Sequence, residues 1–217
     1  MKVAIAGAGA MGCRFGYMLA DSGVDVTLID SWKMHVDTIN QQGLLVENEA
    51  GSRHYSLPTV LPEDVSGSFD MLIVFTKAMQ MDEMLQKIAP VLASAKVVMT
   101  LSNGLGNIET LEKYVDRSVI YAGVTLWSCE LEGPGHIRAT GSGNIELQPL
   151  TSQNMATADR VVEMFNHAGL NAELSPNVLL SIWKKAAFNS VMNTFCALLD
   201  CNVGSFGNRP GALDLAR

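Results

Sequence analysis

The sequence predicts an α/β fold in which helices cover both faces of a mainly parallel sheet. Apolar runs of strand length alternate with segments of helical periodicity over residues 2–114, and the connections between them are short. A glycine cluster follows the first of these strands and opens the first helix. Such alternation is typical of a doubly wound sheet. The chain of 217 residues is long enough for one large domain and part of another.

The first half of the chain supplies the expected parallel strands. Strands are predicted at residues 2–6, 24–29, 70–75 and 96–101. Helices are predicted at residues 10–20, 32–40, 79–92 and 108–114, and a small hairpin at 44–46 with 54–57. The strand at 70–75 is apolar throughout, which is typical of a strand covered on both faces.

In the second half of the chain the predicted secondary structure changes twice, first to strands with glycine turns and then to long helices. Residues 119–147 hold strand-like runs between glycine turns, which predicts antiparallel strands added to the edge of the sheet. A helix is expected at 156–168. Residues 178–199 form a long helix that is apolar almost all round, as in a helical bundle, yet only a short Gly- and Asn-containing segment follows it. We therefore predict an α/β domain at 1–175 and the truncated start of an all-α domain at 176–217.

Composition narrows the classes of function. The formal net charge of -7 disfavours a nucleic-acid partner, because phosphate binding needs clustered Lys and Arg. No apolar stretch reaches the length of a membrane helix, so no membrane association is expected. The four cysteines form no C-x-x-C pair and the four histidines show no metal-ligand spacing. We expect a cytoplasmic protein with reduced thiols and no metal site.

The glycine cluster matches the pattern G-x-G-x-x-G. Gly7 would permit the tight turn, Gly9 would let the backbone approach a pyrophosphate, and Gly12 would let the helix pack on the strand. The N-terminus of the helix offers free N–H groups to phosphates. The position of the pattern between a strand and a helix predicts a Rossmann-type dinucleotide-binding domain. The cofactor-binding residues expected here are Gly7, Ala8, Gly9, Ala10, Met11 and Gly12.

Asp30 ends the second predicted strand, eighteen residues after Gly12. Its carboxylate could accept hydrogen bonds from the adenosine ribose and would repel a 2′-phosphate. Asp30 therefore favours NAD over NADP as the cofactor, although Lys33 lies near enough to soften that preference. A plainer role is capping of the following helix, and one side chain could do both.

Lys185, Asn189 and Asn193 lie four residues apart on one face of the long helix. This stripe could be a solvent face, but Asn is a poor helix former, and two aligned asparagines favour a polar wall that faces a ligand. Hydride addition to a 2-oxoacid develops negative charge on the carbonyl oxygen, which an ammonium could stabilise and protonate. Amide groups could hold the other substrate oxygens.

Four segments together resemble the ketopantoate reductase (2-dehydropantoate 2-reductase) family over essentially the whole chain. They are AGAGAMG at 6–12, TKA at 76–78, SNGLGN at 102–107 and WKKAAFNSVMN at 183–193. The resemblance implies an NAD(P)-dependent oxidoreductase that reduces ketopantoate to pantoate in pantothenate biosynthesis. It implies that Lys185 is the catalytic proton donor and that Lys185, Asn189 and Asn193 bind the substrate.

Three further roles follow from the same resemblance. Lys77 matches the cofactor-side lysine of the family, and Asn103 matches an asparagine near both nicotinamide and substrate. Cys129 matches a backbone contact to the cofactor in a looser part of the alignment. The plainer readings are turn chemistry for Asn103 and a surface position for Lys77. Both, however, follow predicted parallel strands, where open α/β sheets bind ligands.

The chain departs from the family pattern at several positions. NADPH-using members of the family often carry an Arg where this chain has Asp30-Ser31. Val203 stands at the expected place of a family Asn, and a late Ser and Glu of the family cannot be assigned.

The alternative function is an NADH-dependent D-2-hydroxyacid dehydrogenase on the same fold. A different class is a non-catalytic nucleotide-binding fragment. We also expect a homo-oligomer, a dimer formed through the helical domain.

Overall fold

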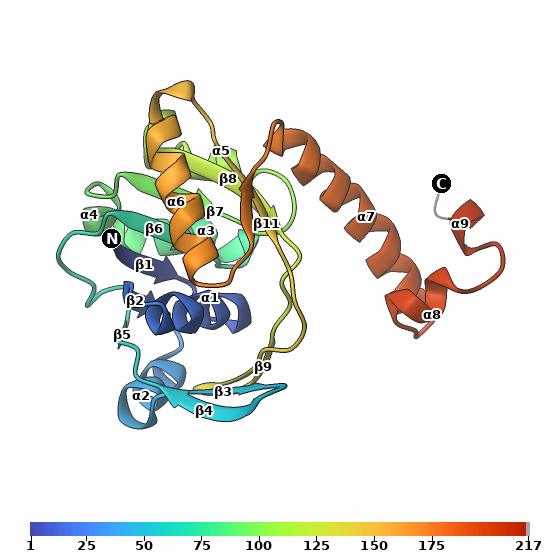
Figure 1. Ribbon diagram of the computed structural model, residues 1–217, viewed down its shortest axis with the longest axis horizontal. Coiled ribbons are helices and arrows are strands. Elements are labelled where there is room, and N and C mark those ends of the chain that lie inside the picture. The colour runs from blue at the N-terminus through green and yellow to red at the C-terminus, as the bar shows by residue number, and fades with distance from the viewer. Residues whose placement is uncertain (216–217) are drawn as a thin grey trace.

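A mixed sheet of eight strands forms the centre of the computed structural model, which describes residues 1–215 (Figure 1). Its strand order is β12-β11-β8-β7-β6-β1-β2-β5. The strands are β1 (Lys2–Ala6), β2 (Asp25–Ile29), β5 (Thr59–Val60), β6 (Met71–Val74), β7 (Val97–Thr100), β8 (Ile120–Thr125), β11 (Ile145–Pro149) and β12 (Ala172–Leu174). From β5 to β8 all neighbours are parallel, whereas β11 runs antiparallel to β8. The predicted doubly wound sheet with an antiparallel edge is confirmed.

The central strands are buried on both faces because helices cover each side. In β1, Val3 and Ile5 belong to one apolar cluster, while Ala4 and Ala6 belong to another on the opposite face. The first cluster includes side chains of α1 (Ala10–Asp21) and α6 (Met155–His167), and the second those of α3 (Ala78–Lys87), α4 (Ala89–Leu92) and α5 (Asn107–Leu111). This two-sided burial explains why these strands read as continuous apolar runs.

A smaller sheet of four described strands lies below the main one in the view of Figure 1, in the order β4-β3-β10-β9. Its strands are β3 (Leu44–Asn48), β4 (Gly51–Tyr55), β9 (Glu130–Gly133) and β10 (His136–Arg138). The predicted hairpin is confirmed, but β9 and β10 join it instead of extending the main sheet. Gly135 accounts for this docking: its N–H donates to His35 Nδ1 over 2.9 Å, and a Cβ there would meet Thr38 Cγ2 at 2.6 Å.

The helix predicted at 79–92 is interrupted. The backbone leaves helical geometry at the buried Ile88 (φ -97, ψ 11), which separates α3 from α4. Pro90 lacks an N–H and its ring crowds the preceding turn, so a continuous helix cannot pass through this point. Short 3-10 turns occupy Arg117–Val119 and Ser152–Asn154.

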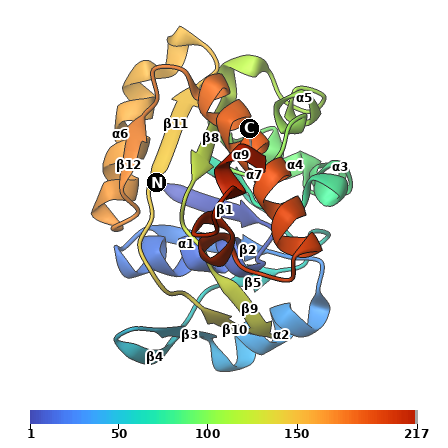
Figure 2. The same ribbon diagram turned by 90° about the vertical axis from the view of Figure 1, so that its right-hand side faces the viewer.

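The helix α7 (Val178–Leu198) leaves the α/β body and carries α8 (Val203–Gly207) and α9 (Ala212–Leu215) at its far end (Figure 1). Asn177 caps its start by accepting a hydrogen bond from the backbone N of Leu180. Turned by 90°, the molecule shows α7 passing across the side of the body where β8 lies (Figure 2). The helix α7 contacts β8, and Lys185 of α7 is hydrogen-bonded to Thr125, the last residue of that strand.

Candidate functional site

The three glycines of the loop between β1 and α1 differ in backbone conformation and in the space that a Cβ would find. Gly7 has a positive φ of 95°, and a Cβ there would lie 2.7 Å from the backbone N of Thr76. A Cβ at Gly12 would lie 2.0 Å from the carbonyl oxygen of Gly7. A Cβ at Gly9, in contrast, would meet nothing within 4 Å. Gly7 and Gly12 thus serve the fold, while Gly9 leaves open space before the helix N-terminus, where a phosphate fits.

A cavity of about 440 Å³ opens beside this loop. It is lined by Gly7 and Gly9 from the loop, Asp30 from the end of β2, and Thr76 and Lys77 after β6. Three separately predicted cofactor elements therefore meet at one cavity, at the carboxyl ends of parallel strands. Ala8 is buried, and Ala10 and Met11 are partly buried in the first turn of α1.

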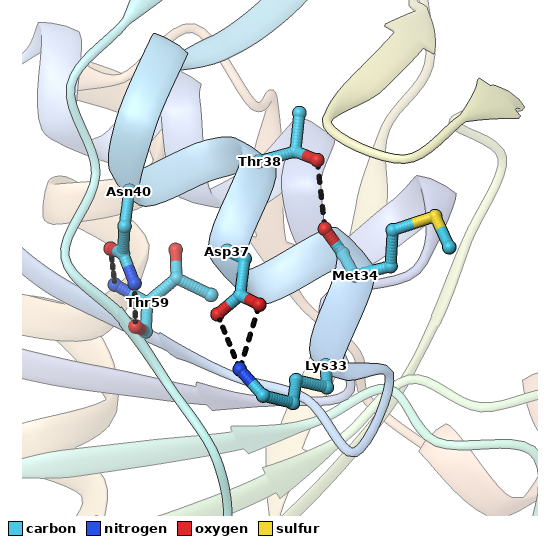
Figure 3. A network of polar contacts seen from close by, with 6 residues as sticks. All are labelled: Lys33, Met34, Asp37, Thr38, Asn40 and Thr59. Carbon is cyan, nitrogen blue, oxygen red and sulfur yellow. Dashed lines mark hydrogen bonds and ion pairs between the residues drawn. The ribbon is translucent and has the colours of Figure 1, made fainter.

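The acidic end of β2 is held in a defined orientation. Asp30 Oδ1 accepts a hydrogen bond of 2.8 Å from the backbone N of Trp32, which closes a local turn and engages one of the two oxygens. Trp32 is the N-cap residue of the next helix, and no side chain caps that helix, so the capping role considered for Asp30 is not present. The Lys33 ammonium is paired with both Asp37 oxygens, at 2.9 and 2.7 Å (Figure 3). The Asn40 amide exchanges two hydrogen bonds with the backbone of residue 59, which ties the helix α2 (Lys33–Gln42) to β5.

A second cavity, of about 180 Å³, adjoins the first, because Phe75, Thr76 and Lys77 line both. The other residues that line it are Met11, Ala78, Leu101, Ser102, Asn103, Thr125, Trp127 and Lys185. Thr76 Oγ1 is buried at the junction and has no hydrogen-bond partner within residues 1–215. An orphaned hydroxyl between two connected cavities fits a bound polar ligand that extends through both.

Lys185 reaches the second cavity from α7. Its Nζ donates a hydrogen bond to the backbone carbonyl oxygen of Thr125, at the end of β8. Burial disfavours the charged form and lowers the pKa of Lys185 from its usual value. An ammonium with a lowered pKa gives up a proton more readily than an ordinary surface lysine.

Asn103 enters the cavity from the loop after β7. Gly104 and Gly106 both have positive φ, of 94° and 87°, so the turn could not carry ordinary side chains there without strain. The Asn107 amide braces the loop by donating to the carbonyl oxygens of Ser102 and Asn103, each over 3.2 Å. The turn noted in the sequence therefore holds Asn103, an exposed residue, at the lining of the cavity.

Six predicted residues do not line either cavity: Ala8, Ala10 and Gly12 beside the glycine loop, and Cys129, Asn189 and Asn193. Asn189 is partly buried and Asn193 is exposed, one and two turns beyond Lys185 on α7. Cys129 packs against the main core, and burial raises the pKa of its thiol to about 11. Their assigned roles stay predictions. Two cavity residues that the sequence reasoning did not single out are Ser102 and Trp127; Ser102 lies inside the SNGLGN motif, whereas nothing marked Trp127.

Over residues 1–215, the side chains of His, Cys, Asp and Glu form no group of three or more that could hold a metal ion. Within the same residues, the helices lack the combination of length and apolar character that a membrane span requires.

The glycine loop, the two adjoining cavities and the partly buried Lys185 define a dinucleotide-dependent oxidoreductase. Within that class, the profile described as "Ketopantoate reductase PanE/ApbA" matches residues 3–152, and "Ketopantoate reductase PanE/ApbA C terminal" matches residues 177–217. The chain belongs to the ketopantoate reductase family.

Individual relatives agree with this assignment. The chain is 42% identical over 217 residues to the 2-dehydropantoate 2-reductase of Lactococcus lactis, covering 99% of this chain and 70% of that protein. A solved structure of D-mandelate dehydrogenase with NADH and anilino(oxo)acetate is 42% identical, with a TM-score of 0.95. A putative 2-dehydropantoate 2-reductase of Enterococcus faecalis is also 42% identical, with a TM-score of 0.83. The chain covers 70% of each of these two structures, and each covers all of this chain.

Proposed function

We propose that the protein reduces a 2-oxoacid, 2-dehydropantoate, to the corresponding 2-hydroxyacid with a nicotinamide cofactor. The observation that carries the proposal is that Lys185 and Asn103 line one cavity, which adjoins the cavity of the glycine loop through Phe75, Thr76 and Lys77. A cofactor on the glycine loop would therefore have its reactive end directed toward a lysine and an amide.

The residues present fit such a cofactor. The N-terminus of α1 and the open space at Gly9 would hold the pyrophosphate, Asp30 the adenosine ribose, and Thr76 Oγ1 would gain the partner that it lacks within residues 1–215. When bound, the cofactor supplies the hydride. The roles of Ala8, Ala10, Met11, Gly12 and Cys129 as further cofactor contacts belong to the same proposal.

The chain's own contribution is the proton. As hydride adds to C2, the carbonyl π electrons move onto oxygen, and that oxygen takes a proton from Lys185 Nζ, which becomes a neutral amine. The hydrogen bond to Thr125 holds the ammonium in place, and the lowered pKa of Lys185 favours this transfer. Asn103 would orient the substrate, and Asn189 and Asn193 would hold its more distant oxygens.

We propose NADH as the preferred cofactor. Asp30 lines the loop cavity and presents a carboxylate where a 2′-phosphate would lie. The nearby cation of Lys33 is engaged by both oxygens of Asp37. This pairing supports the preference, because the side chain that could have received a 2′-phosphate already has an anionic partner.

A second candidate is an NADH-dependent D-2-hydroxyacid dehydrogenase with another 2-oxoacid as its substrate. The structural similarity to D-mandelate dehydrogenase favours it. Rates with 2-dehydropantoate and with phenylglyoxylate, each with NADH and with NADPH, separate the two. Higher kcat/KM for 2-dehydropantoate supports the first proposal, and the reverse order supports the second.

Lys185→Ala provides the test of mechanism, and Lys184→Ala is its matched control. Lys184 is the exposed neighbour on α7 and does not line the 180 Å³ cavity that contains Asn103, although both lysines line a separate hollow of about 560 Å³. We expect Lys185→Ala to abolish turnover while NADH binding persists, and Lys184→Ala to keep turnover within a few-fold. Cofactor binding without turnover in the unaltered protein would instead favour the non-catalytic alternative.

We further propose that the protein forms a homodimer in the cytoplasm. Large apolar side chains on α7 are exposed, which supports association through the helical part; they are Leu179, Leu180, Trp183, Phe188 and Leu198. All four cysteines are free thiols, the state that a reducing compartment maintains. Light scattering during size-exclusion chromatography tests the dimer, and a monomer at all concentrations would overturn it.

A further inference from the structure

Trp127 is fixed at the wall of the Lys185 cavity by contacts on several sides. Its indole Nε1 donates to the carbonyl oxygen of Leu170 over 2.8 Å, and its backbone N donates to Thr125 Oγ1 over 3.1 Å. A Cβ on Gly143 would lie 2.8 Å from Trp127 Cγ, so only glycine permits this close packing. The indole is therefore held in one orientation.

Arg14 completes the support from α1. Its guanidinium lies 4.2 Å from the centroid of the Trp127 ring, a cation–π contact. Although only 3% exposed, it donates to the carbonyl oxygens of Ser128 at 2.5 Å, Thr140 at 2.8 Å and Gly141 at 2.9 Å. A buried charge is expensive unless it is well bonded. These three hydrogen bonds join Arg14 to residue 128 and to residues 140–141, and they fix the guanidinium against the indole ring.

Trp127 and Lys185 share an anchor. Lys185 Nζ donates to the Thr125 carbonyl oxygen, and the Trp127 backbone N donates to the Thr125 hydroxyl, so both residues line the cavity beside the end of β8. If Lys185 meets the C2 oxygen of a 2-oxoacid, the indole meets another group attached to C2. The two such groups are the carboxylate and the C3 substituent.

The lining of the cavity decides between them. Polar side chains of Lys77, Ser102 and Asn103 line the cavity from the loops after β6 and β7 and suit the carboxylate. The broad face of an indole suits a hydrocarbon group instead. Resting on the proposed function, we propose that Trp127 packs against the C3 substituent and selects 2-oxoacids that are branched at C3, with Arg14 as its positioning residue.

The test compares kcat/KM for 2-dehydropantoate, 3-methyl-2-oxobutanoate and pyruvate, all with NADH. The wild type favours the two branched acids over pyruvate by about 10-fold or more, because each added apolar carbon in a close-packed pocket is worth that order of discrimination. Trp127→Ala reduces this ratio to within a few-fold of one and leaves the KM for NADH unchanged. Trp127→Phe retains a ring and most of the ratio.

Arg14→Lys keeps the charge but loses the planar fork that binds several carbonyls. We expect Arg14→Lys to lower the ratio of kcat/KM for the branched acids to kcat/KM for pyruvate, while kcat/KM for pyruvate itself stays near the wild-type value. A general loss of stability would instead lower kcat/KM for all three acids. Equal losses for all three acids in Trp127→Ala and Trp127→Phe would overturn the inference, as would an effect on the KM for NADH alone. Wild-type reduction of all three acids with equal efficiency overturns the selection but not the proposed function; reduction of none overturns both.

Discussion

Lys185 of α7 donates a hydrogen bond to the backbone carbonyl oxygen of Thr125, the last residue of β8. This contact joins the long C-terminal helix to the carboxyl edge of the parallel sheet. It places an ammonium in the cavity that adjoins the glycine loop. The proposed chemistry depends on this link, because the residues for the cofactor and for the proton come from segments more than a hundred residues apart.

The first prediction concerns pH. The lysine acts as an acid, so its protonated form is the active one, and activity is lost as pH rises through its pKa. Because burial lowers the pKa of Lys185 below the usual 10.5, the alkaline limb of kcat/KM falls at a lower pH than it would for an exposed lysine. A kcat/KM profile with saturating NADH measures this. A rate that stays flat through pH 10.5 would contradict the assignment.

The second prediction concerns cofactor choice. Asp30→Asn removes the charge but keeps an oxygen that can accept the bond from Trp32 N. Removing a like charge beside a 2′-phosphate relieves a repulsion worth more than about 1.4 kcal/mol, so the ratio of kcat/KM with NADPH to that with NADH rises roughly 10-fold or more. Asp37→Asn is the companion variant, since it releases Lys33 and shifts the ratio in the same direction. An unchanged ratio in Asp30→Asn would remove the argument for NADH.

The third prediction separates two glycines of one motif. In Gly12→Ala the new Cβ overlaps the Gly7 carbonyl oxygen, so the free energy of unfolding falls by about 3 kcal/mol or more. In Gly9→Ala the Cβ enters open space and stability changes by less than about 1 kcal/mol. Denaturant unfolding measures both effects.

The same pair tests the pyrophosphate site. Gly9→Ala places a methyl group where the phosphates would approach, so the Kd for NADH rises about 10-fold, which corresponds to about 1.4 kcal/mol. Calorimetric titration with NADH checks this. Tight binding of NADH by Gly9→Ala would show that the cofactor lies elsewhere.

The fourth prediction concerns the asparagines of α7. Asn189 is partly buried one turn from Lys185, and its replacement by Ala removes one hydrogen bond to substrate, worth about 1 kcal/mol. The KM for 2-dehydropantoate therefore rises several-fold while the KM for NADH stays constant. Asn193 is exposed two turns away, and Asn193→Ala has the smaller effect. The opposite order of the two effects would refute the assigned roles.

Much of the main sheet could be predicted because its signals are local. The run at 70–75 is buried on both faces as β6, and the glycine loop lies between β1 and α1 as the pattern requires. The second sheet could not be predicted, since the pairing of β10 with β3 joins residues about ninety positions apart. It depends on the fit of Gly135 against α2, which no local pattern encodes.

The site divides in the same way. Four site residues follow strand ends or lie on a helix face, where the sequence pattern identifies them as candidates. They are Asp30, Lys77, Asn103 and Lys185, and all four line the two cavities. Trp127 lacks such a pattern. Its position depends on a cation–π contact with Arg14 and on a hydrogen bond to the carbonyl of residue 170, groups that only the folded chain brings together.

The most direct test of the central claim is the consumption of NADH by the purified protein with 2-dehydropantoate, compared between the wild type, Lys185→Ala and Lys184→Ala. We expect substrate-dependent oxidation of NADH that is lost in Lys185→Ala and retained in Lys184→Ala, with NADH bound by all three proteins. Undiminished turnover in Lys185→Ala would contradict it.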